Sequence, residues 1–160
     1  MQIVNFYGTK MLALITPNNY QQHRQKIKSG DLLAWSTSSA IGRLIRMWTG
    51  QTYSHVGIAW VVGQRVFVIE AMDGIGVRIM TLSDRLPFYH ISTTIDWTNE
   101  RETLALSKVG ERYSYLDAIR AGLGIKTTAK GWQCAEFSAM VLGVDVEDAT
   151  PGEIVERVLS

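Results

Sequence analysis

Cysteine is almost absent from this chain of 160 residues, which contains a single one, Cys134. One thiol cannot form an intrachain disulfide, so the sequence gives no sign of an oxidising compartment. A chain of this length buries roughly 70% of its unfolded surface and therefore needs no cross-link to stay folded. Any thiol chemistry of the protein must belong to Cys134.

Strong net charge and long apolar runs are missing too. The formal net charge is +1, which predicts no strong attraction to nucleic acid or to anionic lipid. The longest apolar run, Val56 to Val62, is far shorter than the roughly 18 residues of a membrane span. The first residues lack the basic and apolar regions of a signal peptide. We therefore expect a cytoplasmic protein, with release by phage-type lysis as the alternative.

The sequence also lacks the spacings that bind metals and nucleotides. His23, His55, His90 and Cys134 show no pattern such as two histidines four residues apart. Gly74-Ile75-Gly76 lacks the third glycine and the following helix of a dinucleotide loop. We therefore expect no metal and no cofactor.

What the chain does contain is a succession of strand and helix patterns. It is 46% apolar and 19% charged, which is ordinary for one globular domain, assigned here to 1–160 with its core over about 30–143. Short apolar runs predict strands, and apolar residues at spacings of three and four predict helices. We expect strands over 32–35, 53–60, 65–71, 77–82 and 88–92, extended by 95–97, and helices over 18–28, 41–48, 98–102 onward, 115–121, 134–143 and from 150. This order predicts an α+β fold with a central antiparallel sheet packed against helices.

The two strands over 53–60 and 65–71 are predicted to form a hairpin. Gly63-Gln64 fits a two-residue turn with glycine in its first position. That register places Ile58 opposite Ile69 on an apolar face, and brings His55 and Glu70 together on the other face. A slip of one residue would put His55 and Glu70 on opposite faces.

Cys134, His55 and Glu70 supply the thiol, imidazole and carboxylate of a cysteine nucleophile site. Cys134 lies where a helix is predicted to begin, so backbone N–H groups and the helix dipole would favour its thiolate and hold an oxyanion. The same helix is expected to bury Phe137, Met140 and Val141. Taken singly, each candidate is more often structural: a core cysteine, a satisfied histidine, a solvated glutamate. Together they are harder to explain that way, because a buried Glu70 needs a partner.

These residues resemble a known superfamily. The matching segments are Gly30-Asp31-Leu32-Leu33, Tyr53-Ser54-His55-Val56-Gly57-Ile58, Val68-Ile69-Glu70-Ala71 and Gln133-Cys134-Ala135-Glu136-Phe137. They are similar to the circularly permuted branch of the NlpC-type papain-like cysteine hydrolases, which includes YiiX/YebB-like and lecithin:retinol acyltransferase-like proteins. In this branch the histidine strand precedes the cysteine helix, as it does here. The chain departs from the acyltransferase signature Asn-Cys-Glu-His-Phe, since Gln133 and Ala135 flank its cysteine.

The resemblance implies roles for individual residues. Cys134 would be the nucleophile, His55 the base and Glu70 the residue that orients His55. Tyr53, Tyr115 and Gln133 are candidate substrate-binding residues, since the superfamily often places a tyrosine near the thiol.

The implied activity is that of a cysteine peptidase or amidase. It would cleave an amide bond of a peptide or N-acyl substrate through a thioester intermediate, a peptidoglycan stem peptide being one candidate. Two alternatives remain open at this point: an acyltransferase or thioesterase acting on lipid-like acyl groups, and a non-catalytic interaction protein with the same fold. The alternatives differ in whether Cys134 reacts and with which acyl donor.

Overall fold

The computed structural model describes residues 4–7, 10–36, 52–72, 74–111, 132–146 and 150–160. Its strands form one antiparallel sheet of seven strands in the order β1-β2-β7-β3-β4-β5-β6. The strands are β1 (Val4–Tyr7), β2 (Lys10–Ile15), β3 (Leu32–Trp35), β4 (His55–Val62), β5 (Arg65–Met72), β6 (Gly76–Thr81) and β7 (Phe88–Ile91). The helices are α1 (Tyr20–His23), α3 (Asn99–Ser107), α5 (Trp132–Leu142) and α6 (Pro151–Leu159), with 3₁₀ turns η1 (Arg24–Lys26) and η2 (Leu82–Arg85). The predicted α+β class with an antiparallel sheet is confirmed.

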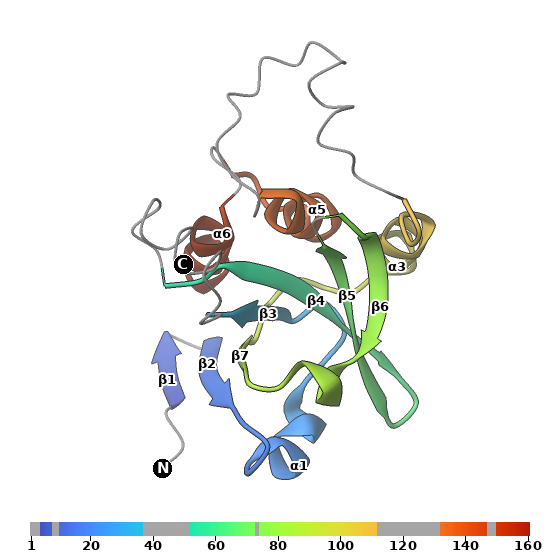
Figure 1. Cartoon of the computed structure of the whole chain (residues 1–160). Helices are drawn as coiled ribbons and strands as arrows, with labels where there is room; N and C mark the ends of the chain where they lie inside the picture. The colour runs from blue at the N-terminus through green and yellow to red at the C-terminus, as the bar shows by residue number, and fades with distance from the viewer. Residues whose placement is uncertain (1–3, 8–9, 37–51, 73, 112–131, 147–149) are drawn as a thin grey trace.

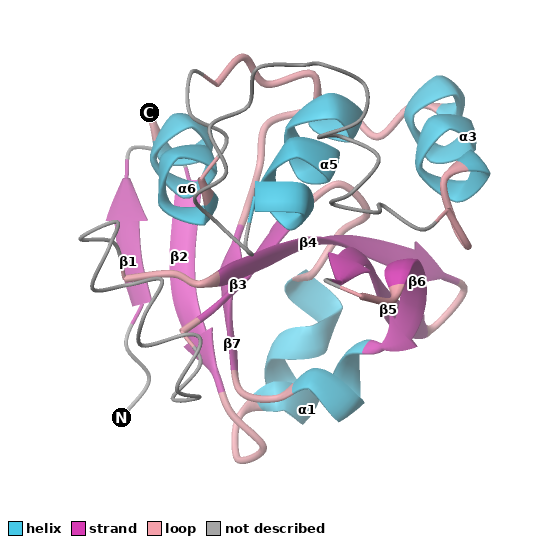
Figure 2. Cartoon of the chain, turned by 45° about the horizontal axis from the view of Figure 1, so that its top comes forward, coloured by secondary structure: helices cyan, strands magenta, loops and turns pink. Residues whose placement is uncertain are grey.

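Helices cover both faces of the sheet, and each face has its own apolar core. Figures 1 and 2 show α3, α5 and α6 on one side of the sheet and α1 on the other. Strand residues such as Ile58 and Ile69 pack with Phe137 of α5 in the first core. Leu33 and Val68 point to the opposite face and pack with residues that include Phe88. The period-two alternation of the strands therefore produces two cores rather than one.

The β4–β5 hairpin has the predicted register. Ile58 pairs with Ile69, and Val62 pairs with Arg65, so the turn consists of Gly63 and Gln64. Gly63 has a φ of 58°, a conformation that glycine adopts without steric cost. The hairpin therefore puts His55 and Glu70 on one face, as its alternation requires.

Two of the later helices begin at threonine caps. The side chain of Thr98 accepts a hydrogen bond from the Arg101 N–H, and that of Thr150 accepts one from the Glu153 N–H. Pro151 follows Thr150 at the first helical position, where its missing N–H costs nothing. In α5, Cys134 is the third residue, so the thiol lies in the first turn as predicted.

Several other predictions need correction. The strands β1 and β2 were not anticipated, because the first 15 residues carry no clean alternation. Residues 95–97 do not extend the sheet; instead, the indole N–H of Trp97 donates to Glu102. Met140 is 41% exposed, because it lies off the stripe on which Phe137 and Val141 are buried.

Some expectations remain outside the described residues. The predicted helices over 41–48 and 115–121 both fall there, and so does Tyr115. Among the helices that the structure describes, none has the length and apolar character needed to cross a membrane.

Candidate active site

His55 and Glu70 form a direct contact at the core of the candidate site. The imidazole Nε2 of His55 lies 2.7 Å from Oε2 of Glu70. The Glu70 side chain is completely buried, whereas that of His55 is 13% exposed. His55 is the first residue of β4 and Glu70 the sixth of β5, so the hairpin register alone brings the pair together.

Gly57 leaves the space that this pair needs. A Cβ atom at this position would lie 2.7 Å from Cγ2 of Val68 and 3.2 Å from Cβ of Glu70. Cβ atoms do not approach other carbons that closely, so any larger residue would displace its neighbours. The sequence signal is a glycine inside a strand, which often marks a close approach.

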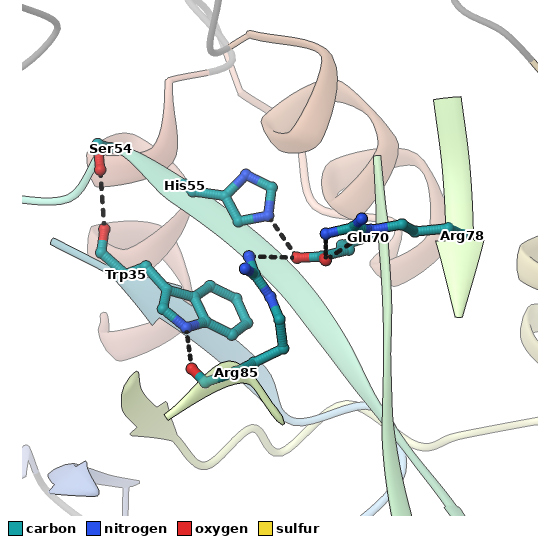
Figure 3. Close-up of polar contacts among 6 residues, drawn as sticks. All are labelled: Trp35, Ser54, His55, Glu70, Arg78 and Arg85. Carbon is teal, nitrogen blue, oxygen red and sulfur yellow. Dashed lines mark hydrogen bonds and ion pairs between the residues drawn. The ribbon is translucent and has the colours of Figure 1, made fainter. Parts of the chain in front are cut away.

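Two arginines neutralise the buried carboxylate (Figure 3). Arg78 donates from Nε and Nη2 to Oε1 of Glu70, at 3.0 and 2.9 Å, and Arg85 donates from Nη2 to Oε2 at 2.9 Å. Burial by itself raises the pKa of Glu70, but the hydrogen bonds and charges of His55, Arg85 and Arg78 outweigh it and lower this pKa to about 2. Glu70 is therefore ionised at neutral pH.

Cys134, in the first turn of α5, contacts His55. α5 packs against β4 and β5, and the Cys134 side chain hydrogen-bonds the imidazole. Since Nε2 faces Glu70, the ring nitrogen left for the sulfur is Nδ1. Burial lowers the pKa of His55, but the charge and hydrogen bond of Cys134, followed by those of Glu70, raise it to about 9. Cys134 itself is 2% exposed.

The structure thus brings together three of the residues predicted from sequence. Of the predicted substrate-binding residues, Tyr53 lies two positions before His55, and its ring packs edge-on against Tyr89 with centroids 5.3 Å apart. Gln133 precedes Cys134 in α5, but its side chain lies outside the described part of the chain, as does Tyr115.

Sequence reasoning missed Arg78, Arg85 and Trp35. Arg78 had a usable signal, because it pairs directly with Glu70 across β5 and β6. Arg85 lies in η2, beyond the end of β6, and only the tertiary fold brings it back to Glu70. Trp35 pairs with His55 across β3 and β4, and their ring centroids are 5.3 Å apart.

A second imidazole–carboxylate cluster lies elsewhere in the sheet. Nε2 of His90 is 2.8 Å from Oδ2 of Asp31, and Nδ1 of His90 is 2.8 Å from Nε2 of His23. All three side chains are buried. Burial, followed by the charges of His90 and Lys26, lowers the pKa of His23 to about 4 despite the opposing effect of Asp31. No pattern in the sequence indicates that these residues meet.

Comparison with known proteins finds a likeness of fold. No family model and no curated protein matches this sequence. Among solved structures, the chain is similar to the metalloprotein yiiX from Escherichia coli O157:H7, a DUF1105 protein, with a TM-score of 0.53 and 18% sequence identity. The match covers 72% of this chain and 64% of that chain, so this chain spans less than two thirds of its structural neighbour. The likeness shows a YiiX-like fold.

Proposed function

We propose that this protein is a cysteine hydrolase of papain-like, permuted NlpC organisation that cleaves an amide bond of a peptide or N-acyl substrate. One observation carries the proposal: His55 contacts both the buried Glu70 carboxylate, through Nε2, and the side chain of Cys134. This is the order of nucleophile, base and orienting residue that thiol acyl transfer requires. The YiiX-like fold is compatible with it.

The first half of the reaction forms a thioester. His55 accepts the proton of the Cys134 thiol, and the sulfur attacks the acyl carbon of the amide. Backbone N–H groups in the first turn of α5 stabilise the developing oxyanion. As the tetrahedral intermediate collapses, the carbon–nitrogen bond breaks and His55 gives its proton to the departing amine. Cys134 is then left acylated and His55 neutral.

The second half hydrolyses the thioester. Neutral His55 accepts a proton from water as the water oxygen attacks the thioester carbon. Collapse of that intermediate breaks the carbon–sulfur bond, releases the acid and returns the proton to the His55–Cys134 pair. Glu70 stays ionised throughout and holds Nε2–H of His55, which fixes the ring with Nδ1 toward the sulfur.

These residues do not suit a metal ion, although the structural neighbour is described as a metalloprotein. Both oxygens of Glu70 accept hydrogen bonds from arginines, whose positive charges would repel a cation. Within the described ranges, no group of three or more His, Cys, Asp or Glu side chains is arranged to hold a metal. The mechanism therefore uses no metal-dependent step.

The test is the rate at which iodoacetamide alkylates Cys134 as a function of pH, in the wild type and in His55→Ala. A paired thiolate reacts well below the free-cysteine pKa of about 8.5, and the variant should lose this reactivity. Because Cys134 is the only cysteine, every label reports on it. A thiol that reacts only after denaturation would overturn the proposal and favour a non-catalytic role.

The substrate class is tested by trapping the intermediate. Incubation with N-acyl amides followed by acid quench should give an acyl adduct on Cys134, detected by mass spectrometry of the intact protein. Adducts from acyl-chain esters but not from amides would replace amide hydrolysis with the acyltransferase or thioesterase alternative.

A further inference from the structure

The two arginines that contact Glu70 are not equivalent. Arg78 binds Oε1, the oxygen that His55 does not contact. Arg85 binds Oε2, the same oxygen that accepts from Nε2 of His55. Any movement of the Arg85 guanidinium therefore acts on the oxygen that orients the imidazole.

Trp35 holds Arg85 and His55 in place together. Its indole N–H donates to the backbone carbonyl of Arg85 at 2.7 Å, and the Arg85 guanidinium carbon lies 5.0 Å from the centroid of the Trp35 ring. The same ring lies against His55, at 5.3 Å between centroids and 46° between planes. Trp35, Arg85, Glu70 and His55 thus contact one another in turn. Figure 3 shows the hydrogen bonds and ion pairs among them.

The position of Arg85 also carries a cost. Its Nε is buried and has no hydrogen-bond partner among the described residues. A buried donor without a partner opposes folding, so some other requirement must fix the guanidinium here. Its contacts with Oε2 of Glu70 and with the Trp35 ring are that requirement.

We propose that Arg85, supported by Trp35, is a positioning residue of the active site that holds Oε2 of Glu70 against Nε2 of His55. Arg78, in contrast, mainly supplies charge, because it binds the other oxygen from the adjacent strand. The inference rests on the proposed function, since the imidazole that is positioned is the base of that reaction.

The experiment uses four variants of the full chain. Arg85→Met removes the charge and the Nη2 donor to Oε2. Arg85→Lys keeps the charge but loses the guanidinium that lies over the Trp35 ring, and Arg78→Met removes the equivalent charge at Oε1. Lys108→Met removes a charge from an exposed ion pair and controls for net charge. Thermal unfolding of each variant establishes that it is folded.

The first readout is the imidazole N–H signal of His55 in proton NMR of protein labelled with ¹⁵N-histidine. In the wild type, a strong hydrogen bond to Oε2 should shift this signal downfield and protect it from exchange. It should be lost in Arg85→Met and in Arg85→Lys, and kept in Arg78→Met and Lys108→Met. A merely structural arginine would not distinguish these variants.

The second readout is the alkylation rate of Cys134 at neutral pH. We expect about a tenfold loss in both Arg85 variants, because a misplaced imidazole pairs poorly with the thiol, and less than about a threefold loss in Arg78→Met. An alkylation rate in Arg85→Lys as low as that in Arg85→Met would show that the position of the guanidinium matters, and not its charge alone. Equal rates and equal N–H signals for Arg85→Met and Arg78→Met would overturn the inference.

If Arg85→Met does not fold, Trp35→Phe decides. This change keeps a ring beside His55 but removes the N–H that holds the Arg85 carbonyl. A weaker His55 N–H signal with slower alkylation supports the inference, and a wild-type signal and rate overturn it. Failure of the proposed function looks different, since the wild type itself would then show no His55-dependent reactivity.

Discussion

Two imidazole–carboxylate pairs in this sheet have nearly the same geometry. His55 and Glu70 are 2.7 Å apart, and His90 and Asp31 are 2.8 Å apart. Both carboxylates are buried. The contact between imidazole and carboxylate therefore does not by itself distinguish the proposed catalytic site from the second cluster.

The two pairs differ in the other residues that each of them contacts. Glu70 is held by two arginine side chains, and its histidine contacts a thiol. Asp31 accepts from the backbone N–H groups of Lys28 and Thr93, and its histidine contacts a second imidazole. In the first cluster an imidazole is made more basic, with the pKa of His55 at about 9, whereas in the second the pKa of His23 falls to about 4. At neutral pH, His55 is therefore protonated beside Cys134, whereas His23 is neutral.

We expect the largest effect from replacing the thiol of the first cluster. Cys134→Ser should lower amide turnover by more than about 1,000-fold, because a hydroxyl is a far weaker nucleophile than a thiolate. Stability should change little, since serine has nearly the same volume. Steady-state release of amine from an N-acyl amide measures turnover, and urea unfolding measures stability. Turnover at the wild-type rate would contradict the nucleophile assignment.

The second prediction breaks the other cluster. His90→Leu removes the hydrogen bonds of His90 to Asp31 and to His23, and the loss of one partner of a buried polar group costs about 1–3 kcal/mol. We therefore expect a loss of roughly 2–6 kcal/mol in the free energy of unfolding, measured in urea. The folded fraction should still alkylate Cys134 at the wild-type rate. Slower alkylation without a loss of stability would mean that this cluster serves the active site.

The third prediction separates the clusters by pH. The unperturbed histidine pKa is about 6.5. The folded-state pKa of His23 is lower, about 4, so its contribution to stability should fall as the pH drops from 6.5 toward 4. That of His55 is higher, about 9, so its contribution is complete below 6.5 and is lost as the pH rises toward 9. We call the change in stability between pH 6.5 and 4 the acid limb and that between pH 6.5 and 9 the alkaline limb. Each limb has a slope of at most about 1.4 kcal/mol per pH unit.

Single variants should remove one limb at a time. His23→Gln should flatten the acid limb between pH 6.5 and 4, and His55→Gln the alkaline limb between pH 6.5 and 9. Cys134→Ala should also weaken the alkaline limb, because Cys134 is the leading cause of the raised pKa of His55. Stability from urea unfolding at a series of pH values measures all three. Glu70 adds a further acid loss from about 4.5 to about 2, which His23→Gln should leave unchanged.

The same comparison explains what sequence could predict. The hairpin is local: Gly63-Gln64 sets the turn, alternation sets the faces, and His55 and Glu70 follow from the register. Cys134 could be placed at a helix start from its own surroundings. The contact of Arg85 with Glu70 and that of His23 with His90 could not be predicted, since they join segments that only the assembled sheet brings together. β1 and β2 form without a clear alternating pattern, because the pairing of β1 with β2 and of β2 with β7 decides their state.

Gly57 offers the smallest change that should separate the two clusters. In the sheet, Leu33 pairs with Gly57 on one side and with His90 on the other, so one strand lies between the clusters. Gly57→Ala places a methyl group against Val68 and Glu70, and overpacking of this kind costs about 1–3 kcal/mol. Because the added atom meets Glu70, the His55 N–H signal should weaken and alkylation of Cys134 should slow. The His90 signals should stay as in the wild type.

Gly63 is a matched control that distinguishes steric crowding from backbone strain. At Gly63, a Cβ would meet nothing within 4 Å, and only the φ of 58° opposes a side chain. Gly63→Ala should therefore cost about 1–2 kcal/mol through backbone strain and leave the His55 N–H signal and the alkylation rate unchanged. If both alanine variants destabilise the protein equally and neither changes the His55 signal, Gly57 serves the sheet alone. If only Gly57→Ala changes that signal, the glycine belongs to the active site, because the space it leaves is what lets Glu70 reach His55.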